Sequence, residues 1–153
     1  AIKNSKFNYK VVFPNNDSGS NIILNAYKIL KNKKNIKIFP SLRFEHYLSL
    51  LKASNFIIGN SSSGVREAPY YGTPTINIGN RQNKRSSSKS IINVDFKRNE
   101  IEKLIKKFKE RKINFKKQKE FGDGKADKKF VNIISKKSFW KIDNQKYFKD
   151  KTL

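Results

Sequence analysis

The sequence predicts an α/β fold built on a parallel sheet, and two patterns lead to this prediction. Short apolar runs of strand length alternate with longer stretches in which apolar residues recur every three or four positions, as on one side of a helix. The short runs are almost continuously apolar, which is typical of parallel strands covered by helices on both faces. The 153 residues, 36% of them hydrophobic, suffice for one core. We therefore expect a single domain with a Rossmann-like parallel sheet over residues 1–153.

The first strand and helix lie near the start of the chain. Residues 11–13 (VVF) form an apolar run that is closed by Pro14, which has no N–H for strand pairing. Ser18 or Ser20 can cap a helix that continues to about Leu30, because apolar residues follow at helical spacing.

The middle of the chain continues the alternation. Residues 36–39 (IKIF) form the next strand, and residues 44–51 place apolar side chains at positions i, i+3, i+4 and i+7, which predicts an amphipathic helix. Residues 56–58 (FII) are a fully apolar strand. A further helix is expected to begin at Ser63.

The last part of the chain gives two more strands and two more helices. Residues 75–78 (TINI) and 91–94 (IINV) have the length and composition of buried strands. Apolar residues at helical spacing predict one helix over residues 101–108 and another over residues 126–134.

The charge of the chain is strongly positive and admits two interpretations. Lys and Arg number 35 against 12 Asp and Glu, which gives a net charge of +23, but only six of the 35 are arginine. The lysines accompany many Asn and Ile residues, as in a chain whose whole composition is biased. The alternative is a surface that binds a polyanion such as nucleic acid. Charge alone does not decide between them.

Residue counts exclude several kinds of site. The absence of cysteine excludes disulfides, thiol catalysis and cysteine-ligated zinc or iron–sulfur centres, and a single histidine, His46, excludes a His-rich metal site. We expect neither a metal nor a cofactor. No apolar run approaches the ~18–20 residues of a membrane span, and the first residues show no apolar signal segment. The expected location is cytoplasmic, without a membrane partner.

The richest segment for chemistry is the junction after the third predicted strand, residues 57–69 (IIGNSSSGVREAP). Small residues and three serines stand where a parallel strand ends and a helix begins, which is where open α/β sheets bind ligands. The serine hydroxyls and free backbone N–H groups suit a phosphate, and the Glu67 carboxylate could accept hydrogen bonds from a ribose diol. Alternatively, Ser61, Ser62 and Ser63 only cap the helix and Glu67 complements its dipole. The segment is neither a Walker A loop nor a G-x-G-x-x-G fingerprint.

Residues 59–69 (GNSSSGVREAP) and 72–82 (GTPTINIGNRQ) together resemble the hydrolysing UDP-N-acetylglucosamine 2-epimerases, and among these the sialic-acid-pathway type. Residues 13–20 (FPNNDSGS) and 121–126 (FGDGKA) share the resemblance, which extends over about residues 11–134. The family implies a glycosyltransferase-B-type fold, in which the nucleotide sugar lies between two Rossmann-like halves. The sequence resembles only the C-terminal half, so we expect the N-terminal catalytic half to be absent from this chain.

The resemblance implies a UDP site in this half. Ser61 and Ser62 would hold the diphosphate, and Glu67 would hold the ribose. No catalytic residue is implied here, because the acid/base carboxylates of the family come mainly from the N-terminal half.

Further positions are implied around the same ligand. Arg81 would lie against UDP, the backbone next to Leu42 would lie near the uracil, and Asn15 would approach the ligand. One departure concerns the loop that follows: Lys84 stands before Arg85 where the family often has glycine, so no role is implied for Arg85.

The implied reaction is elimination of UDP from UDP-N-acetylglucosamine through loss of the C2 proton, followed by hydration of the glycal to N-acetylmannosamine. The full-length enzyme is expected to be a homo-oligomer that binds UDP-N-acetylglucosamine or UDP, and this chain alone is expected to be inactive. Two alternatives remain open. One is part of an epimerase for a 2,4-diacetamido sugar nucleotide or of another glycosyltransferase-B enzyme. The other is a basic nucleic-acid-binding module, whose affinity would fall steeply with salt.

The C-terminal segment contains four aromatic residues with no predicted place in the core. In the family this segment runs back toward the first domain, so the resemblance predicts that the aromatic side chains are exposed here. They are Phe139, Trp140, Tyr147 and Phe148.

Overall fold

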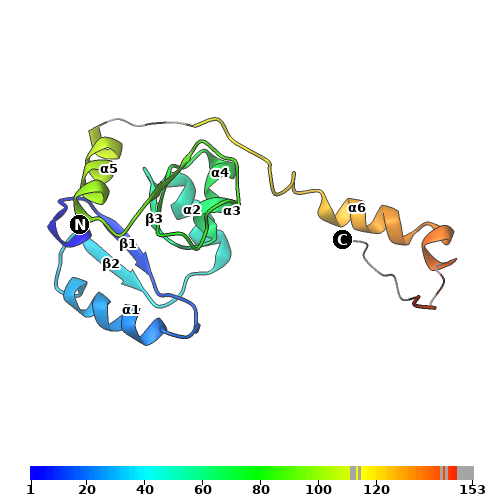
Figure 1. Cartoon of the computed structure of the whole chain (residues 1–153), viewed down its shortest axis with the longest axis horizontal. Helices are drawn as coiled ribbons and strands as arrows, with labels where there is room; N and C mark the ends of the chain where they lie inside the picture. Colours follow the sequence, from blue (N-terminus) through cyan, green and yellow to red (C-terminus); the bar gives the residue numbers. More distant parts are fainter. Residues whose placement is uncertain (111–112, 114, 142, 144, 148–153) are drawn as a thin grey trace. The chain divides into compact units, whose positions relative to one another are not determined.

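The structure is a computed structural model that describes residues 1–110, 113, 115–141, 143 and 145–147. The chain divides into two compact units, Ala1–Glu120 and Phe121–Leu153, which we call the first and second units. The first unit contains all five strands that the structure describes, and Figure 1 labels many of its elements. It carries every residue of the candidate UDP site.

The first unit begins with a sheet of two parallel strands. β1 (Tyr9–Val12) pairs with β2 (Ile36–Phe39), with Tyr9 opposite Ile36 and Val12 opposite Phe39. Between the strands run α1 (Ser20–Tyr27) and a 3-10 turn, η2 (Lys28–Leu30), and another 3-10 turn, η1 (Ile2–Asn4), precedes β1. Tyr9, Leu30 and Ile36 form the buried centre of this part.

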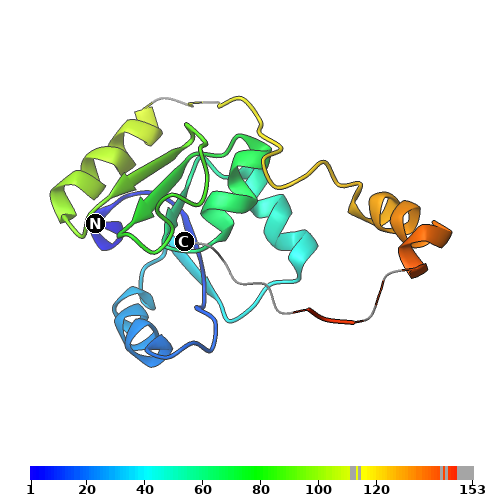
Figure 2. The same ribbon diagram turned by 45° about the vertical axis from the view of Figure 1, so that its right-hand side comes forward.

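A second parallel sheet has three strands in the order β3-β4-β5. Its strands are β3 (Ile57–Gly59), β4 (Thr75–Ile78) and β5 (Ile91–Val94). Helices lie on both of its faces, with α5 on one side and α3, α4 and α2 on the other (Figure 2). These helices are α2 (Phe44–Ala53), α3 (Ser63–Arg66), α4 (Ala68–Tyr71) and α5 (Arg98–Glu110).

The main core lies between the second sheet and α5. Every third or fourth residue of α5 faces the sheet, as the spacing predicted, and the apolar stripe meets alternate residues of β4 and β5. The buried members of this cluster are Ile76, Val94, Ile101, Ile105 and Phe108.

The parallel α/β prediction is confirmed, since every strand pair in the described chain is parallel. Two details differ from expectation. The strands form two sheets rather than one, because β1 and β3 do not pair. The apolar side of α1 is also not buried: Ile22 is 75% exposed, and within α1 and η2 only Leu30 is buried, with Tyr27 partly buried against the same cluster.

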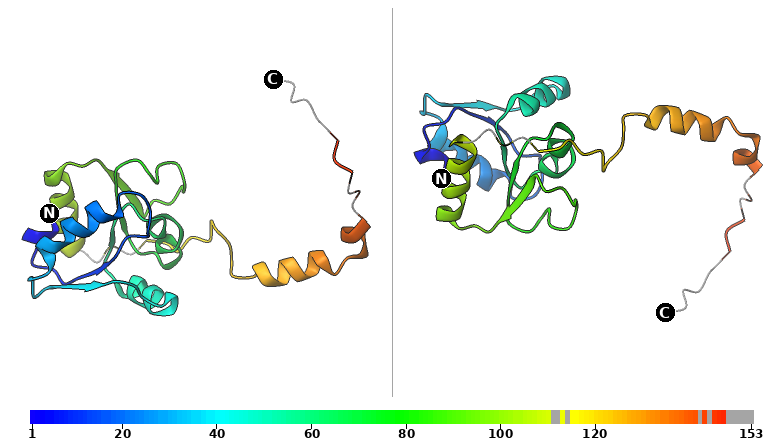
Figure 3. Two further views of the ribbon diagram at one scale, coloured as in Figure 1. Left: turned by 90° about the horizontal axis from the view of Figure 1, so that it is seen from below. Right: turned by 90° about the horizontal axis from the view of Figure 1, so that it is seen from above.

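The second unit consists of α6 (Ala126–Ile134) and a 3-10 turn, η3 (Lys137–Lys141), which Figure 3 shows in two further views. Asp123 accepts hydrogen bonds from the Lys125 amide at 3.2 Å and from Lys129 Nζ at 3.3 Å, and these bonds lower the pKa of its carboxyl. Phe139, Trp140 and Tyr147 are exposed, as expected. Phe148 lies outside the described residues.

No helix in the described ranges combines the length and the apolar character that crossing a membrane requires.

Candidate functional site

The loop after β3 carries the serines expected to bind phosphate. β3 ends at Gly59, Ser61 and Ser62 are exposed, and α3 begins at Ser63. The Ser63 amide donates to Ser61 Oγ at 3.3 Å, while the Ser62 side chain makes no capping hydrogen bond. Both exposed serines therefore lie at the carboxyl end of a parallel strand, as the sequence predicted.

Glu67 lies where the helix after these serines is interrupted. A helix does begin at Ser63, but it forms two short pieces, α3 and α4, with Glu67 between them. Pro69 explains the interruption, because it has no N–H to donate to the carbonyl of Val65 four residues earlier. Oε2 of Glu67 is buried and has no hydrogen-bond partner among the described residues. A buried acceptor of this kind is destabilising until a donor reaches it.

A hydrogen bond between α2 and α3 holds the first residue of α3 in place. The Tyr47 hydroxyl on α2 donates to Ser63 Oγ at 2.6 Å. Burial raises the pKa of Tyr47, the bond to Ser63 lowers it, and the negative charge of Glu67 raises it further. The Ser63 hydroxyl thus takes part in a hydrogen bond within the protein. Ser61 and Ser62 are the serines of this loop whose side chains are exposed to a ligand.

Gln82 connects the loop after β4 to the loop after β3. It is 2% exposed, and its Nε2 donates to the Asn60 carbonyl at 2.9 Å. Arg85 Nη1 donates in turn to Gln82 Oε1 at 2.8 Å, which gives Arg85 a structural contact. Because both ends of the buried amide are satisfied, the two strand ends are held beside each other.

Arg81 lies exposed next to the loop that follows β1. Its Nη2 is 3.6 Å from Asp17 Oδ2, and both side chains are mostly exposed, so this ion pair contributes little stability. Asn15 is exposed on the same loop as Asp17. Asn15, Ser61 and Arg81 therefore lie on exposed loops that follow β1, β3 and β4.

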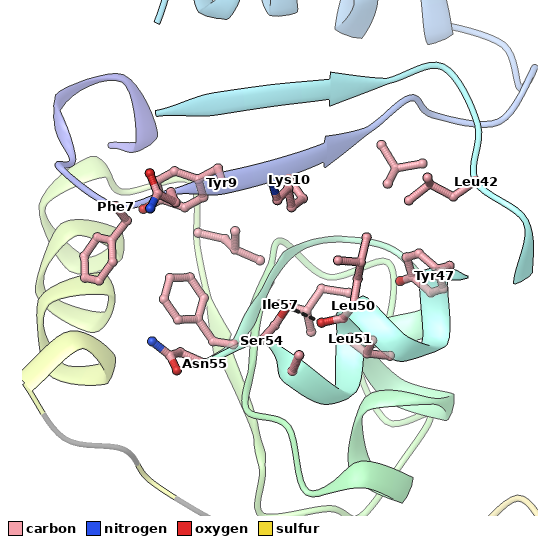
Figure 4. A pocket seen from close by; sticks show the side chains of 15 residues that line it. Phe7, Tyr9, Lys10, Leu42, Tyr47, Leu50, Leu51, Ser54, Asn55 and Ile57 are labelled. Carbon is pink, nitrogen blue, oxygen red and sulfur yellow. Dashed lines mark hydrogen bonds between the residues drawn. The ribbon is translucent and has the colours of Figure 1, made fainter. Parts of the chain in front are cut away.

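Leu42 has a different environment from the other predicted residues. It follows β2, is half-buried, and lines a cavity together with Tyr47 and residues of β1 and β3. Its neighbour Ser41 is exposed. Leu42 and Tyr47 thus line the same cavity (Figure 4), whereas the loop of Ser61 does not line it.

Lys84 has a left-handed backbone with a φ of +61°. Lys84 is the one non-glycine residue in the described chain with a positive φ. Its Cβ makes this conformation cost about 1–2 kcal/mol. A glycine at this position, which the motif resemblance implied, would carry no such cost.

Replacing Lys84 by glycine is expected to raise the free energy of unfolding by about 0.5–1 kcal/mol, because relief of the strain exceeds the added chain entropy of glycine. Urea denaturation measures the change. Lys84→Ala is the control: it removes the exposed side chain but keeps Cβ, so it should give no such gain. Equal gains from both variants would assign the effect to the lost lysine charge.

Sequence reasoning did not find two residues that shape the site, Tyr47 and Gln82. Tyr47 carries a hydroxyl on the apolar side of a helix, and such a hydroxyl requires a buried partner, which was a usable signal. Gln82 gave no local signal, because its partner Asn60 lies 22 positions away.

Titratable side chains in the described ranges form no group of three or more His, Cys, Asp or Glu that could hold a metal ion. His46 is exposed on α2. The polar groups described around the site are hydroxyls, amides, the guanidinium groups of Arg81 and Arg85 and the carboxylates of Asp17 and Glu67.

Comparison with known proteins decides the family. The model of the family described as UDP-N-acetylglucosamine 2-epimerase matches residues 1–135. The chain belongs to the UDP-N-acetylglucosamine 2-epimerase family. The resemblance found in the motifs of the loops after β1, β3 and β4 is thereby confirmed.

Three bacterial relatives are much longer than the regions that this chain matches. The UDP-N-acetylglucosamine 2-epimerase of Neisseria meningitidis serogroup B is 37% identical over 156 residues, which cover 100% of this chain and 41% of the relative. Polysialic acid biosynthesis protein P7 of Escherichia coli is 34% identical over 139 residues, 91% of this chain and 30% of the relative. The GDP/UDP-N,N'-diacetylbacillosamine 2-epimerase (hydrolyzing) of Campylobacter jejuni is 42% identical over 77 residues, 50% of this chain and 20% of the relative. The chain spans less than half the length of each.

Proposed function

We propose that this chain is the UDP-binding part of a hydrolysing UDP-N-acetylglucosamine 2-epimerase, which converts UDP-N-acetylglucosamine and water to N-acetylmannosamine and UDP. The observation that carries the proposal is the buried, unpartnered Oε2 of Glu67, one short helix away from the exposed Ser61 and Ser62. Membership of the epimerase family supports the substrate class. The chain supplies the C-terminal half of a glycosyltransferase-B-type fold, and an N-terminal half outside it completes a cytoplasmic, homo-oligomeric enzyme.

Glu67 holds the ribose of UDP in this proposal. A ribose diol offers two O–H donors, and a carboxylate accepts both with its two oxygens. Binding gives Oε2 the donor it lacks in the free chain, so the hydrogen bond forms without breaking one inside the protein.

Ser61, Ser62 and Arg81 hold the diphosphate. Both serine hydroxyls are exposed donors, and Arg81 has only a weak surface ion pair with Asp17 to give up. Asn15 lies on the loop of Asp17 and approaches the ligand from the β1 side. Leu42 marks the position of the uracil, next to Tyr47.

The chemistry divides between the two halves. A base in the other half removes the C2 proton, the bond between C1 and the phosphate oxygen breaks, and UDP leaves with that electron pair. Water then adds to the glycal, with hydroxyl at C1 and a proton at C2, to give N-acetylmannosamine. The residues of this chain stabilise the charge that develops on the leaving diphosphate.

A different sugar nucleotide is a second candidate for the substrate. The Campylobacter relative, 42% identical over 77 residues, has a diacetylated sugar in its name, so a 2,4-diacetamido sugar nucleotide is the alternative substrate. The residues proposed here contact the nucleotide, which both substrates share. A turnover assay of a two-half enzyme with both sugar nucleotides separates the candidates.

Calorimetric titration of the chain with UDP and with pyrophosphate tests the proposal. We expect weak binding of UDP, and loss of selectivity for UDP over pyrophosphate by about 10-fold or more in Glu67→Ala, because a hydrogen bond to a charged group is lost. Glu100→Ala, which removes an exposed carboxylate from α5, is the matched control and should keep the selectivity.

Two outcomes would contradict the proposal. Equal heats for UDP and pyrophosphate in the unaltered chain would remove the ribose role of Glu67. Binding of any polyanion, oligonucleotides included, with a steep salt dependence and no preference for UDP would favour the basic nucleic-acid-binding module.

The chain alone should also release no N-acetylmannosamine from UDP-N-acetylglucosamine, and turnover by the purified chain would show that its own residues complete the reaction.

A further inference from the structure

The loop between β4 and β5, residues 79–90, carries Arg81 and has an exposed tip. Near its two ends Gln82 and Ser90 are buried, which fixes the loop where it leaves and re-enters the sheet. The tip between them is largely exposed and includes Lys84 with its left-handed backbone. A residue with a Cβ keeps such a backbone only where its surroundings fix it, so contacts around the tip must hold it in place.

The carboxylate of Glu120 makes such a contact, which we call the Glu120 clamp. It accepts hydrogen bonds from the Ser86 hydroxyl at 2.5 Å and from the Ser87 amide at 3.1 Å, and the Ser87 hydroxyl is a third donor at 3.4 Å. Hydrogen bonds to a charged acceptor are stronger than those between neutral groups. They lower the pKa of the Glu120 carboxyl, the bond from Ser86 most, so the clamp is ionised at neutral pH.

The segment that contains Glu120 is itself held against a helix of the site. This segment, residues 115–120, is called the strap and is drawn in yellow beside α4 in Figure 2. The Gln118 amide donates to the Pro69 carbonyl of α4 at 2.9 Å, and the Phe115 side chain packs against the main core. The strap therefore fixes the clamp carboxylate relative to α4.

These contacts close a ring through the residues proposed to bind the diphosphate. From the clamp, the ring passes through Arg85 and Gln82 to the Asn60 carbonyl by the hydrogen bonds described above. It then follows the chain along the serine loop of Ser61 and through α3 to α4, and the strap returns it to the clamp. Arg81 directly precedes Gln82. The serine loop and the loop of Arg81 therefore cannot separate unless one of these contacts breaks.

We propose that Glu120 is a positioning residue for the diphosphate site: through the clamp it holds the loop of Arg81 beside the serine loop, in the arrangement that binds a diphosphate. This inference rests on the proposed function. A carboxylate repels a phosphate, so Glu120 favours binding only through the groups that it holds in place.

Removal of the carboxylate has two effects of opposite sign, which makes the test sharp. Loss of one negative charge by itself should strengthen the binding of an anion slightly. Loss of the clamp should weaken it, because Arg81 is then no longer held. We expect Glu120→Ala to raise the Kd of pyrophosphate and that of UDP alike, by about 5-fold or more, in calorimetric titrations at one salt concentration. Their ratio should stay the same, in contrast to Glu67→Ala.

Two further variants separate the clamp from the charge. Glu100→Ala, which removes an exposed carboxylate of α5, measures the effect of charge alone and should leave the Kd unchanged or lower it. Ser86→Ala removes a donor of the clamp and keeps the charge, so it should raise the Kd as Glu120→Ala does, and it replaces that variant if Glu120→Ala does not fold. The double variant should be no weaker than the weaker single variant, because both substitutions break one contact.

Amide hydrogen exchange followed by NMR gives a readout that a merely structural role would not move. Coupling between two sites is reciprocal, so bound pyrophosphate must strengthen the clamp by the factor by which the clamp strengthens binding. Saturating pyrophosphate should therefore slow exchange of the Ser87 amide by about 5-fold or more in the unaltered chain. In Glu120→Ala this amide has lost its acceptor, and its exchange should not respond.

Three results would overturn the inference. They are binding of pyrophosphate to Glu120→Ala as tight as to the unaltered chain, additive effects of Glu120→Ala and Ser86→Ala, and exchange of the Ser87 amide that ignores pyrophosphate. Failure of the proposed function looks different: equal heats for UDP and pyrophosphate would remove the ribose role of Glu67 and leave the pyrophosphate comparison intact. Absence of pyrophosphate binding by the unaltered chain would contradict both.

Discussion

Replacing Phe108 by alanine is expected to lower the free energy of unfolding by about 3–5 kcal/mol, the usual cost of emptying a buried aromatic position. Phe108 is 1% exposed, lies on the inner side of α5 and stacks on Phe56 with ring centres 5.8 Å apart. It also packs against Ile76 of the central strand β4 as part of the main core.

Urea denaturation followed by far-ultraviolet circular dichroism measures this change. Phe96→Ala is the matched control, because Phe96 is 83% exposed and its loss should cost less than about 1 kcal/mol. If Phe108→Ala does not fold, Phe108→Leu keeps most of the volume and should cost about 1–1.5 kcal/mol. Equal stability of the Phe108 and Phe96 alanine variants would contradict the core assignment.

Gly64→Ala is expected to cost about 2–3 kcal/mol, because the added methyl group has no room. A Cβ at this position would lie 2.6 Å from Cγ2 of Thr75 on β4. The same threonine donates its hydroxyl to the Gly64 carbonyl at 2.6 Å, so α3 cannot move away from the strand without loss of that bond. The close approach of α3 to β4 therefore positions Glu67 and the serine loop relative to the sheet.

The double variant Gly64→Ala/Thr75→Ser tests this cause. Serine lacks Cγ2 but keeps the hydroxyl, so it should recover about half of the loss or more. Urea denaturation of the two single variants and the double variant gives the coupling between the sites. Purely additive effects would show that the clash is not with the Thr75 methyl group.

The boundaries of β2, β4 and β5 could be predicted from the sequence because each is a compact apolar run. The helix from Ser63 was found, but its interruption at Glu67 required attention to Pro69, whose effect reaches four residues back along the chain. The division into two sheets could not be predicted, since strand pairing depends on residues far apart in sequence. Periodicity shows that a segment is a strand, not which neighbour it pairs with.

The candidate site could likewise be predicted only in part from the sequence. Small residues at a strand end located the serine loop correctly, because this signal is local. The contact between Tyr47 and Ser63 and the one between Gln82 and Asn60 join segments 16 and 22 positions apart, and neither pair follows from spacing. Local patterns thus indicated where the serine loop lies, and the tertiary contacts determine how this loop and its neighbours are held.

The position of the sole tryptophan determines which spectroscopic experiments on this protein are informative. Trp140 belongs to the second unit, is 71% exposed, and donates its indole N–H to the Ile134 carbonyl at 2.7 Å. Its fluorescence therefore reports on the end of α6 and the turn after it. Tyrosine absorbance is the better intrinsic probe of the first unit, because Tyr47 lies beside Glu67 and Tyr9 lies in the core of the first sheet.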